Sequence, residues 1–150
     1  MRKELSNLPF TILLADDDDD DILLTQDAMS SAGIQHDLRV VKDGKALLDY
    51  LNDLEQQQDL KVPNIILLDL NMPIMDGREV LKALKEHEKF KAIPVIILST
   101  SQEIEDIQQG YALGASGYFS KPSSFEDLVK LMQTLNDYWY EWANLPGNLE

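Results

Sequence analysis

Short apolar runs alternate along the chain with segments of helical periodicity. The runs are rich in leucine, isoleucine and valine, and they stop abruptly at polar or charged residues, which favours strands buried on both faces. Pro94 stands only at the first position of its run, where a strand tolerates proline. We predict strands over residues 11–15, 38–41, 64–69, 94–99 and 117–120.

The segments between these runs carry apolar residues at the spacing of one helix face. Gly33 and Gly114 follow two of them and are expected to end those helices. The polar, glutamine-rich segment 52–63 is expected to be an exposed connection. We predict helices over residues 22–32, 45–51, 78–87, from a capping box at 100–103 to about 113, and from Ser123 or Ser124 to about 143.

Continuous apolar strands between helices indicate a parallel sheet that helices cover on both faces. Right-handed crossovers then give a doubly wound α/β fold of three layers with five parallel strands. No internal repeat or linker interrupts the pattern, so we expect residues 1–150 to form a single domain with a core over about 10–143. In such folds the chemistry lies at the carboxyl ends of the strands.

Charge and composition exclude several classes of function. The chain has 27 acidic and 13 basic residues, a formal net charge of −14, which disfavours binding to nucleic acid. It has no cysteine, so disulfides and thiolate chemistry are excluded. The sequence shows neither the apolar run of a signal peptide nor that of a membrane span, and we expect a cytoplasmic protein.

Reactive side chains follow four of the predicted strands: Asp16 and Asp17, Asp69, Ser99, and Lys121. Three neighbouring carboxylates repel one another, and a divalent cation such as Mg²⁺ relieves that repulsion. Asp69 is then a candidate nucleophile for an aspartyl phosphate. Simpler interpretations remain for single residues. Asp69 could be a helix cap, and the run 18–21 could be a solvated loop beside a helix N-terminus.

Four motifs resemble the receiver domain of two-component response regulators. They are the segments 12–17 (ILLADD), 67–77 (LLDLNMPIMDG), 94–99 (PVIILS) and 114–122 (GASGYFSKP), and the resemblance extends over about residues 10–136. It implies a flavodoxin-like sheet and a protein that takes a phosphoryl group from a histidine kinase onto Asp69. The signal would leave through the face formed by the last two helices and the fifth strand.

The resemblance also assigns the metal site. Asp16, Asp17, Asp69 and the backbone carbonyl of Asn71 would hold Mg²⁺, with Mn²⁺ or Ca²⁺ as substitutes, and Asp17 would be the more direct ligand of the acidic pair. The six consecutive aspartates leave a slip of this pair to Asp17 and Asp18 open. We keep Asp16 and Asp17 because they directly follow the apolar strand.

The remaining site residues match positions that respond to the phosphoryl group. Ser99 matches the switch hydroxyl, where threonine is commoner, and Tyr118 its aromatic partner. Lys121 matches the phosphate-binding lysine, and its bond to Pro122 is expected to be cis. Asn71 and Ser101 match the positions that tune autodephosphorylation. The protein would therefore be a phosphoacceptor and not an enzyme with an external substrate.

The segment 52–63 and the aromatic C-terminus are similar to single-domain regulators paired with cyanobacterial and bacterial phytochrome kinases. No output domain is expected, and a histidine kinase of the phytochrome type is the candidate partner. The apolar arc of the last helix is wider than one core needs, which favours a homodimer over simple core cover. The residues expected at that interface are Leu131, Leu135, Tyr138 and Trp142.

Three other functions are weighed against this one. An aspartyl-phosphate phosphatase would need a general acid two residues after the nucleophile, where this chain has Asn71. A flavin-binding module would need a loop rich in Ser, Thr or Gly after the first strand, where the aspartates would repel a phosphate. An intermediate carrier in a phosphorelay remains an alternative to a terminal regulator.

Overall fold

A computed structural model describes residues 10–57 and 62–146. Five parallel strands form one sheet in the order β2-β1-β3-β4-β5. Each predicted strand is confirmed, with its ends displaced by one residue at most. The strands are β1 (Thr11–Ala15), β2 (Asp37–Val41), β3 (Ile65–Leu68), β4 (Val95–Ser99) and β5 (Gly117–Ser120).

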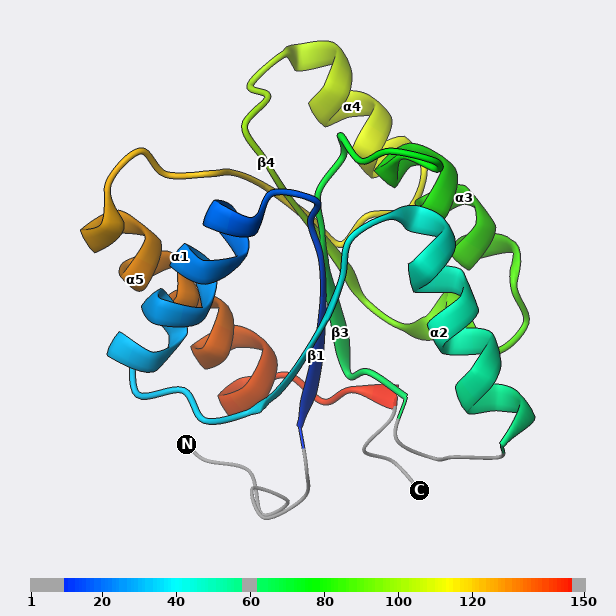
Figure 1. The fold of residues 1–150 in the computed structure, drawn as a ribbon, viewed down its shortest axis with the longest axis horizontal. Coiled ribbons are helices and arrows are strands. Elements are labelled where there is room, and N and C mark those ends of the chain that lie inside the picture. The colour runs from blue at the N-terminus through cyan, green and yellow to red at the C-terminus, as the bar shows by residue number, and fades with distance from the viewer. Residues whose placement is uncertain (1–9, 58–61, 147–150) are drawn as a thin grey trace.

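Helices cover both faces of the sheet, as Figure 1 shows. The helices α1 and α5 lie on one side, and α2 and α3 lie on the other. The predicted three-layer, doubly wound fold is therefore confirmed. The helices are α1 (Asp19–Ser31), α2 (Gly44–Gln56), α3 (Gly77–Glu86), α4 (Ile104–Ala112) and α5 (Phe125–Asn136), with a short 3₁₀ turn η1 (Phe90–Ala92) before β4.

Alternation along the strands divides the core into two clusters, since successive side chains point to opposite faces. One cluster packs Leu13, Ile66 and Ile97 against α2 and α3. The other packs their strand neighbours, Leu14, Leu67 and Leu98 among them, against α1 and α5. Burial on both faces explains why β1, β3 and β4 have continuous apolar sequences.

Two helices extend beyond their predicted ends. Helix α1 begins at Asp19 and not at residue 22, because the Asp18 side chain caps it by accepting the amides of Asp20 and Asp21. Helix α2 continues to Gln56, so the prediction of a connection from residue 52 was wrong for residues 52–56, which are largely exposed but helical. Residues 58–61 of that segment lie outside the described residues.

Helix ends were predicted unevenly from the sequence. Gly33 and Gly114 follow α1 and α4 with positive φ angles of 78° and 107°, which confirms both as stops. The capping box predicted at 100–103 is wrong, because the N-cap of α4 is Glu103 and makes no side-chain cap bond. A capping box is found instead at Asp76 and Glu79, where it begins α3.

The last helix begins after Ser124, as predicted, and continues beyond α5 as a π-helical segment, η2 (Asp137–Trp142). Leu135 is buried in the second cluster, so its predicted place in an interface is wrong: its side chain serves the core. Leu131 is partly buried against the same cluster. Tyr138 and Trp142 are 60% and 64% exposed.

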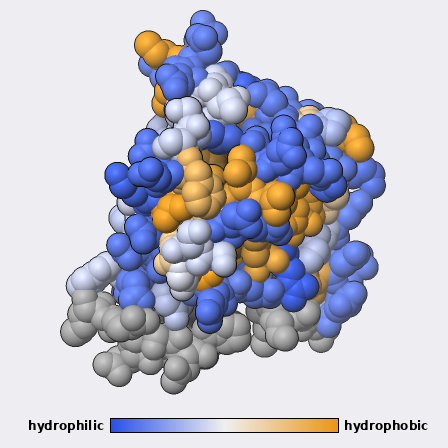
Figure 2. Space-filling model, turned by 60° about the vertical axis from the view of Figure 1, so that its left-hand side comes forward, coloured by the Kyte–Doolittle hydropathy of each residue, from blue (hydrophilic) through white to orange (hydrophobic). Residues whose placement is uncertain are grey.

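Apolar surface gathers on the side that carries α1 and α5, where Figure 2 shows a hydrophobic patch surrounded by hydrophilic surface. Exposed apolar residues of these two helices include Leu23, Leu24 and Phe125. Within residues 10–57 and 62–146, the helices are too short or too polar to cross a membrane.

Candidate phosphoryl-acceptor and metal site

Strand register brings Asp16 and Asp69 together. Ala15, the last residue of β1, pairs with Leu68, the last residue of β3. The next residues of the two strands, Asp16 and Asp69, therefore leave the sheet side by side, and the amide of Asp69 donates to the carbonyl of Ala15 at 3.0 Å. The predicted meeting of carboxylates at the carboxyl edge follows from this pairing.

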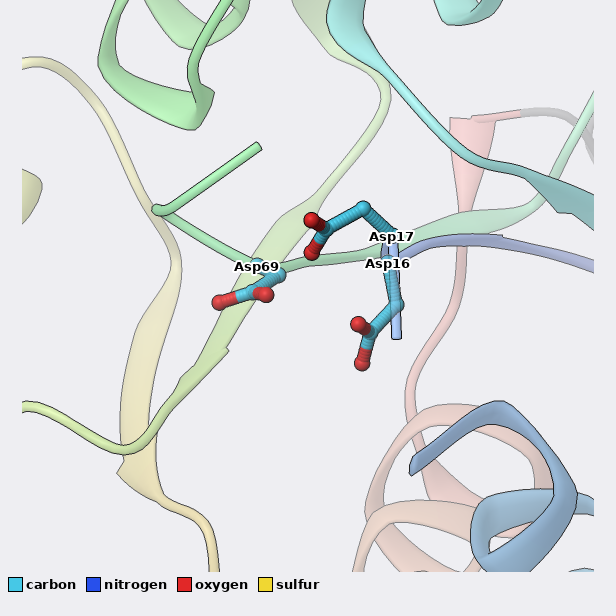
Figure 3. Close-up of side chains that lie close together, drawn as sticks. All are labelled: Asp16, Asp17 and Asp69. Atoms are coloured by element: carbon cyan, nitrogen blue, oxygen red, sulfur yellow. The ribbon is translucent and has the colours of Figure 1, made fainter. Parts of the chain in front are cut away.

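Asp17 completes a group of three carboxylates. One oxygen from each of Asp16, Asp17 and Asp69 lies within 4.8 Å of the others, and among the described residues this is the one such group of possible metal ligands. Figure 3 shows the three side chains gathered where β1 and β3 end. Asp16 and Asp69 are buried, whereas Asp17 is exposed. The group is therefore both concentrated in charge and open to solvent on one side.

Lys121 reaches this group from the end of β5. Its ammonium donates to Asp16 at 2.8 Å and to Asp21 at 2.9 Å, and it lies 3.7 Å from the nearer oxygen of Asp69. Although burial opposes the charged form, the bonds to Asp16 and Asp21 hold the pKa of Lys121 above its ordinary value. The lysine is therefore a permanent cation beside Asp69.

Asp69 is the carboxylate whose protonation is most altered by the site. Burial, opposed by Lys121 and reinforced by Asp16, raises the pKa of Asp69 to about 6. The amide of Asn71 lies 3.5 Å from its other oxygen, at the long end of hydrogen-bonding distance. A partly desolvated carboxylate beside a cation is the arrangement expected of a nucleophile or a metal ligand.

The predicted switch residues form a chain of contacts at the ends of β4 and β5. Ser99 is fully buried, and its hydroxyl accepts the amide of Ser101 at 3.2 Å. The hydroxyl of Tyr118, which is half-buried, donates to the carbonyl of Ser101 at 2.9 Å. Ser101 therefore joins the two residues that the sequence analysis paired.

The acidic run proves to be a helix start. Asp18 is the N-cap of α1 and Asp19, Asp20 and Asp21 form its first turn, so the expected loop is wrong for these three residues. Their expected place at the N-terminal end of a helix dipole is confirmed. The capping bonds occupy Asp18, so the slip of the acidic pair to Asp17 and Asp18 is disfavoured. The ion pair of Asp21 with Lys121 was not predicted from the sequence, because it depends on a helix start at Asp19, which places Asp21 close to the strand end.

Two backbone features shape the loop between β3 and α3. A Cβ on Gly77 would lie 2.4 Å from the carbonyl oxygen of Asp69, so only glycine permits this close approach. Ile74 has a φ of 69°, an unfavourable value for a β-branched residue. The backbone at Gly77 therefore packs directly against the backbone of Asp69, the candidate nucleophile.

The Lys121–Pro122 bond is trans, and no cis peptide bond occurs in residues 10–57 and 62–146, so the prediction of a cis bond was wrong. The trans form is the intrinsically preferred one even before proline. Lys121 reaches Asp16, Asp21 and Asp69 with this bond in the trans form.

The sequence and the fold are both similar to those of a known protein. Response regulator Rcp1 of Synechocystis sp. is 38% identical over 142 residues, which are 95% of this chain and 97% of Rcp1. The Mn²⁺-bound crystal structure of Rcp1 matches with a TM-score of 0.81 at 37% identity, over 92% of this chain and 99% of that one.

Two further relatives differ in what their names describe. The phosphorylated cyanobacterial phytochrome response regulator RcpA matches with a TM-score of 0.84 at 34% identity, over 93% of this chain and 99% of that structure. The probable methanogenesis regulatory protein FilR2 of Methanothrix harundinacea is 38% identical over 139 residues, or 93% of this chain and 89% of FilR2.

The family model of the response regulator receiver domain matches residues 12–133, a range that includes all the site residues described above. The chain therefore belongs to the response regulator receiver domain family.

Proposed function

We propose that Asp69 accepts a phosphoryl group from the phosphohistidine of a histidine kinase. The observation that carries this proposal is the position of the Asp69 carboxylate, buried beside the Lys121 ammonium and the carboxylates of Asp16 and Asp17. A carboxylate oxygen of Asp69 attacks phosphorus, the P–N bond breaks, and its electron pair stays with the histidine. Lys121 offsets the negative charge of the transferred group.

The donor set fits a hard divalent cation, and we take Mg²⁺ as the physiological ion. Asp16, Asp17 and Asp69 supply carboxylate oxygens, the ligands that Mg²⁺ prefers, and the backbone carbonyl of Asn71 completes the proposed set. Asp17 is the most available of the three because it is exposed, whereas Asp16 and Asp69 are buried. Asp16 also already accepts from Lys121 and from the Asp18 amide. A bound ion neutralises phosphoryl charge, and Mn²⁺ or Ca²⁺ would substitute.

Ser99 and Tyr118 are proposed to report the phosphoryl group to the surface. The hydroxyl of Ser99 accepts from Ser101 and can still donate its own proton to a phosphoryl oxygen. Movement of this pair would change the face formed by α4, β5 and α5, a shift between two populated states. Asn71 and Ser101 are proposed to set the rate of autodephosphorylation, the one turnover assigned to the protein.

The proposed partner is a histidine kinase of the phytochrome type, in the cytoplasm. Support comes from the likeness to RcpA, a phytochrome response regulator, over almost all of both chains. FilR2, of similar identity, is named for another process, so the pairing needs its own test. Phosphotransfer from a panel of purified kinases should be fastest from a phytochrome kinase. Faster transfer from an unrelated kinase, or onward transfer to a histidine carrier, would replace this partner or make the protein a relay.

We also propose a homodimer that forms through η2, where Tyr138 and Trp142 expose aromatic surface. Trp142→Glu should convert the phosphorylated protein from dimer to monomer in sedimentation. Leu24→Glu, which changes an exposed apolar residue of α1, is the matched control and should leave the dimer intact. A wild-type protein that stays monomeric when phosphorylated would refute this dimer.

Acetyl phosphate with Mg²⁺ tests the proposed phosphoacceptor without any kinase. The wild-type protein should gain the mass of one phosphoryl group, and Asp69→Asn should gain none. Asp18→Asn, which alters a helix cap beside the site, should be labelled like the wild type. Undiminished labelling of Asp69→Asn would overturn the assignment.

A further inference from the structure

Ser101 lies at the centre of a hydrogen-bond network between β4, β5 and α4. Its amide holds the oxygen of Ser99, and its carbonyl accepts the hydroxyl of Tyr118. Its own hydroxyl donates to Asp106 of α4 at 2.6 Å and accepts the amide of Glu103 at 3.2 Å. The Ser101 side chain is therefore committed to α4, while its backbone holds both switch residues.

Asp106 is in turn fixed by Arg78 of α3. The guanidinium lies 2.7 Å from the second carboxylate oxygen of Asp106, and its Nε donates to Gln109 at 3.1 Å. Both ion-pair side chains are 25% exposed. The hydrogen bond from Ser101 and that from Arg78 hold the pKa of Asp106 below its ordinary value, so it stays ionised at neutral pH. Charge-assisted bonds of this kind are short and directional.

Apart from this network, helix α4 is held by the hydroxyl of Tyr111, which accepts the amide of Tyr118 at 3.2 Å, and it has little buried surface. Gly110 is its one buried residue, and Ile104 and Tyr111 expose most or half of their side chains. The bonds of Arg78 and Ser101 to Asp106 therefore constrain how the start of α4 lies relative to the end of β4. The loop that contains Ser101 depends on this constraint for its position.

We propose that Asp106 and Arg78 are positioning residues that set the orientation of the Ser99 hydroxyl through Ser101. When Asp106 holds the Ser101 hydroxyl, the Ser101 amide donates to the hydroxyl oxygen of Ser99. The O–H of Ser99 is then free to donate to a phosphoryl group. The inference rests on the proposed function, because its effect on activity is an effect on phosphorylation of Asp69. Neither residue touches the reacting atoms.

The test compares Asp106→Ala with the wild type in phosphorylation by acetyl phosphate. Loss of one such hydrogen bond should lower the rate constant about threefold to tenfold. Arg78→Gln should lower it in the same direction. Asp49→Ala, which removes another ion-paired aspartate on α2, is the matched control and should leave the rate unchanged. An unchanged rate in Asp106→Ala would overturn the proposal.

A double-mutant cycle separates positioning from a general structural effect. In a Ser99→Ala background, Asp106→Ala should cause no further loss, because the hydroxyl through which it acts is gone. An equal, additive loss in both backgrounds would mean that Asp106 acts otherwise and would contradict the proposal.

Amide exchange of Ser101 gives a readout that does not depend on phosphorylation. Asp106→Ala should accelerate this exchange about threefold to tenfold, and Asp49→Ala should not. If the wild type were not labelled at all, the proposed function would fail, and accelerated exchange would still establish the network. Unchanged exchange would overturn the network itself.

Discussion

At the scale of single residues, burial and a neighbouring charge have opposing effects on the ionisation of Asp69. Burial favours its neutral form, and Lys121 favours its ionised form, with burial the larger effect. A buried carboxylate with a raised pKa destabilises the folded protein wherever it must be ionised. The same feature that prepares Asp69 to bind a cation or a phosphoryl group therefore reduces stability when neither is present.

Replacing Asp69 with asparagine should stabilise the metal-free protein. The pKa is about 6 in the folded state and 3.8 ordinarily, so ionisation is harder in the folded state. The loss of stability that ionisation of Asp69 causes is absent below about pH 4, grows between about pH 4 and pH 6, and is complete above about pH 6. Near pH 8 with chelator, urea unfolding should show Asp69→Asn more stable by about 1–3 kcal/mol. A difference that persists at pH 4 would contradict the electrostatic cause.

The residues of the site were predicted unequally. Asp16, Asp17 and Asp69 were expected to meet, and they do, because parallel strands end at one edge of the sheet. Asp21 was not expected, because its pairing with Lys121 depends on where α1 begins. The network of Arg78 and Asp106 was also missed, since residues of two different helices meet only through the packed structure.

At the scale of elements, the strands were the most predictable part of the chain. The apolar runs of β1, β3 and β4 are buried on both faces and stop at polar residues, so pattern and environment agree there. The helix ends were less predictable, because several acidic or hydroxyl residues compete as caps. Asp18 caps α1 from within a run of six aspartates, and nothing in the sequence distinguishes it from its neighbours.

Gly77→Ala should disturb the loop that carries Asp69. A methyl group there would meet the Asp69 carbonyl oxygen at 2.4 Å, so the loop must move, at a cost of about 1–3 kcal/mol. The free energy of unfolding and the rate of labelling by acetyl phosphate should both fall.

Gly33→Ala is the control for loss of stability alone. Gly33 has a positive φ of 78° but open space around it, far along the chain from the site. This variant should be destabilised and still be labelled at the wild-type rate. A Gly77→Ala protein with normal labelling would show that the close approach does not position Asp69.

At the scale of the whole molecule, the order of strands determines what the protein can bind. Because β1 lies between β2 and β3, its acidic end faces the end of β3, and Lys121 reaches the same position from β5. The topology was predictable because strands alternate with helices. The role of the aromatic C-terminal segment was less predictable. Its apolar arc packs into the core at Leu135 and is exposed at Trp142.

Divalent metal should stabilise the folded protein, because the carboxylates of Asp16, Asp17 and Asp69 come together only in the folded state. At Mg²⁺ concentrations about a hundred times the dissociation constant, the gain should be roughly 2.7 kcal/mol. Thermal unfolding with and without chelator measures it. Asp17→Asn should lose most of the gain, and Asp20→Asn, in the first turn of α1, should retain it. A full gain in Asp17→Asn would exclude Asp17 as a ligand.

Trapping the acyl phosphate is the most direct way to locate the phosphoryl group that we propose for Asp69. Borohydride reduces an aspartyl phosphate to homoserine, which mass spectrometry of peptides can locate. After treatment with acetyl phosphate and Mg²⁺, we predict homoserine at position 69, and none when metal is chelated or phosphodonor is left out. Homoserine at Asp16, Asp17 or another aspartate, with position 69 unmodified, would contradict the account.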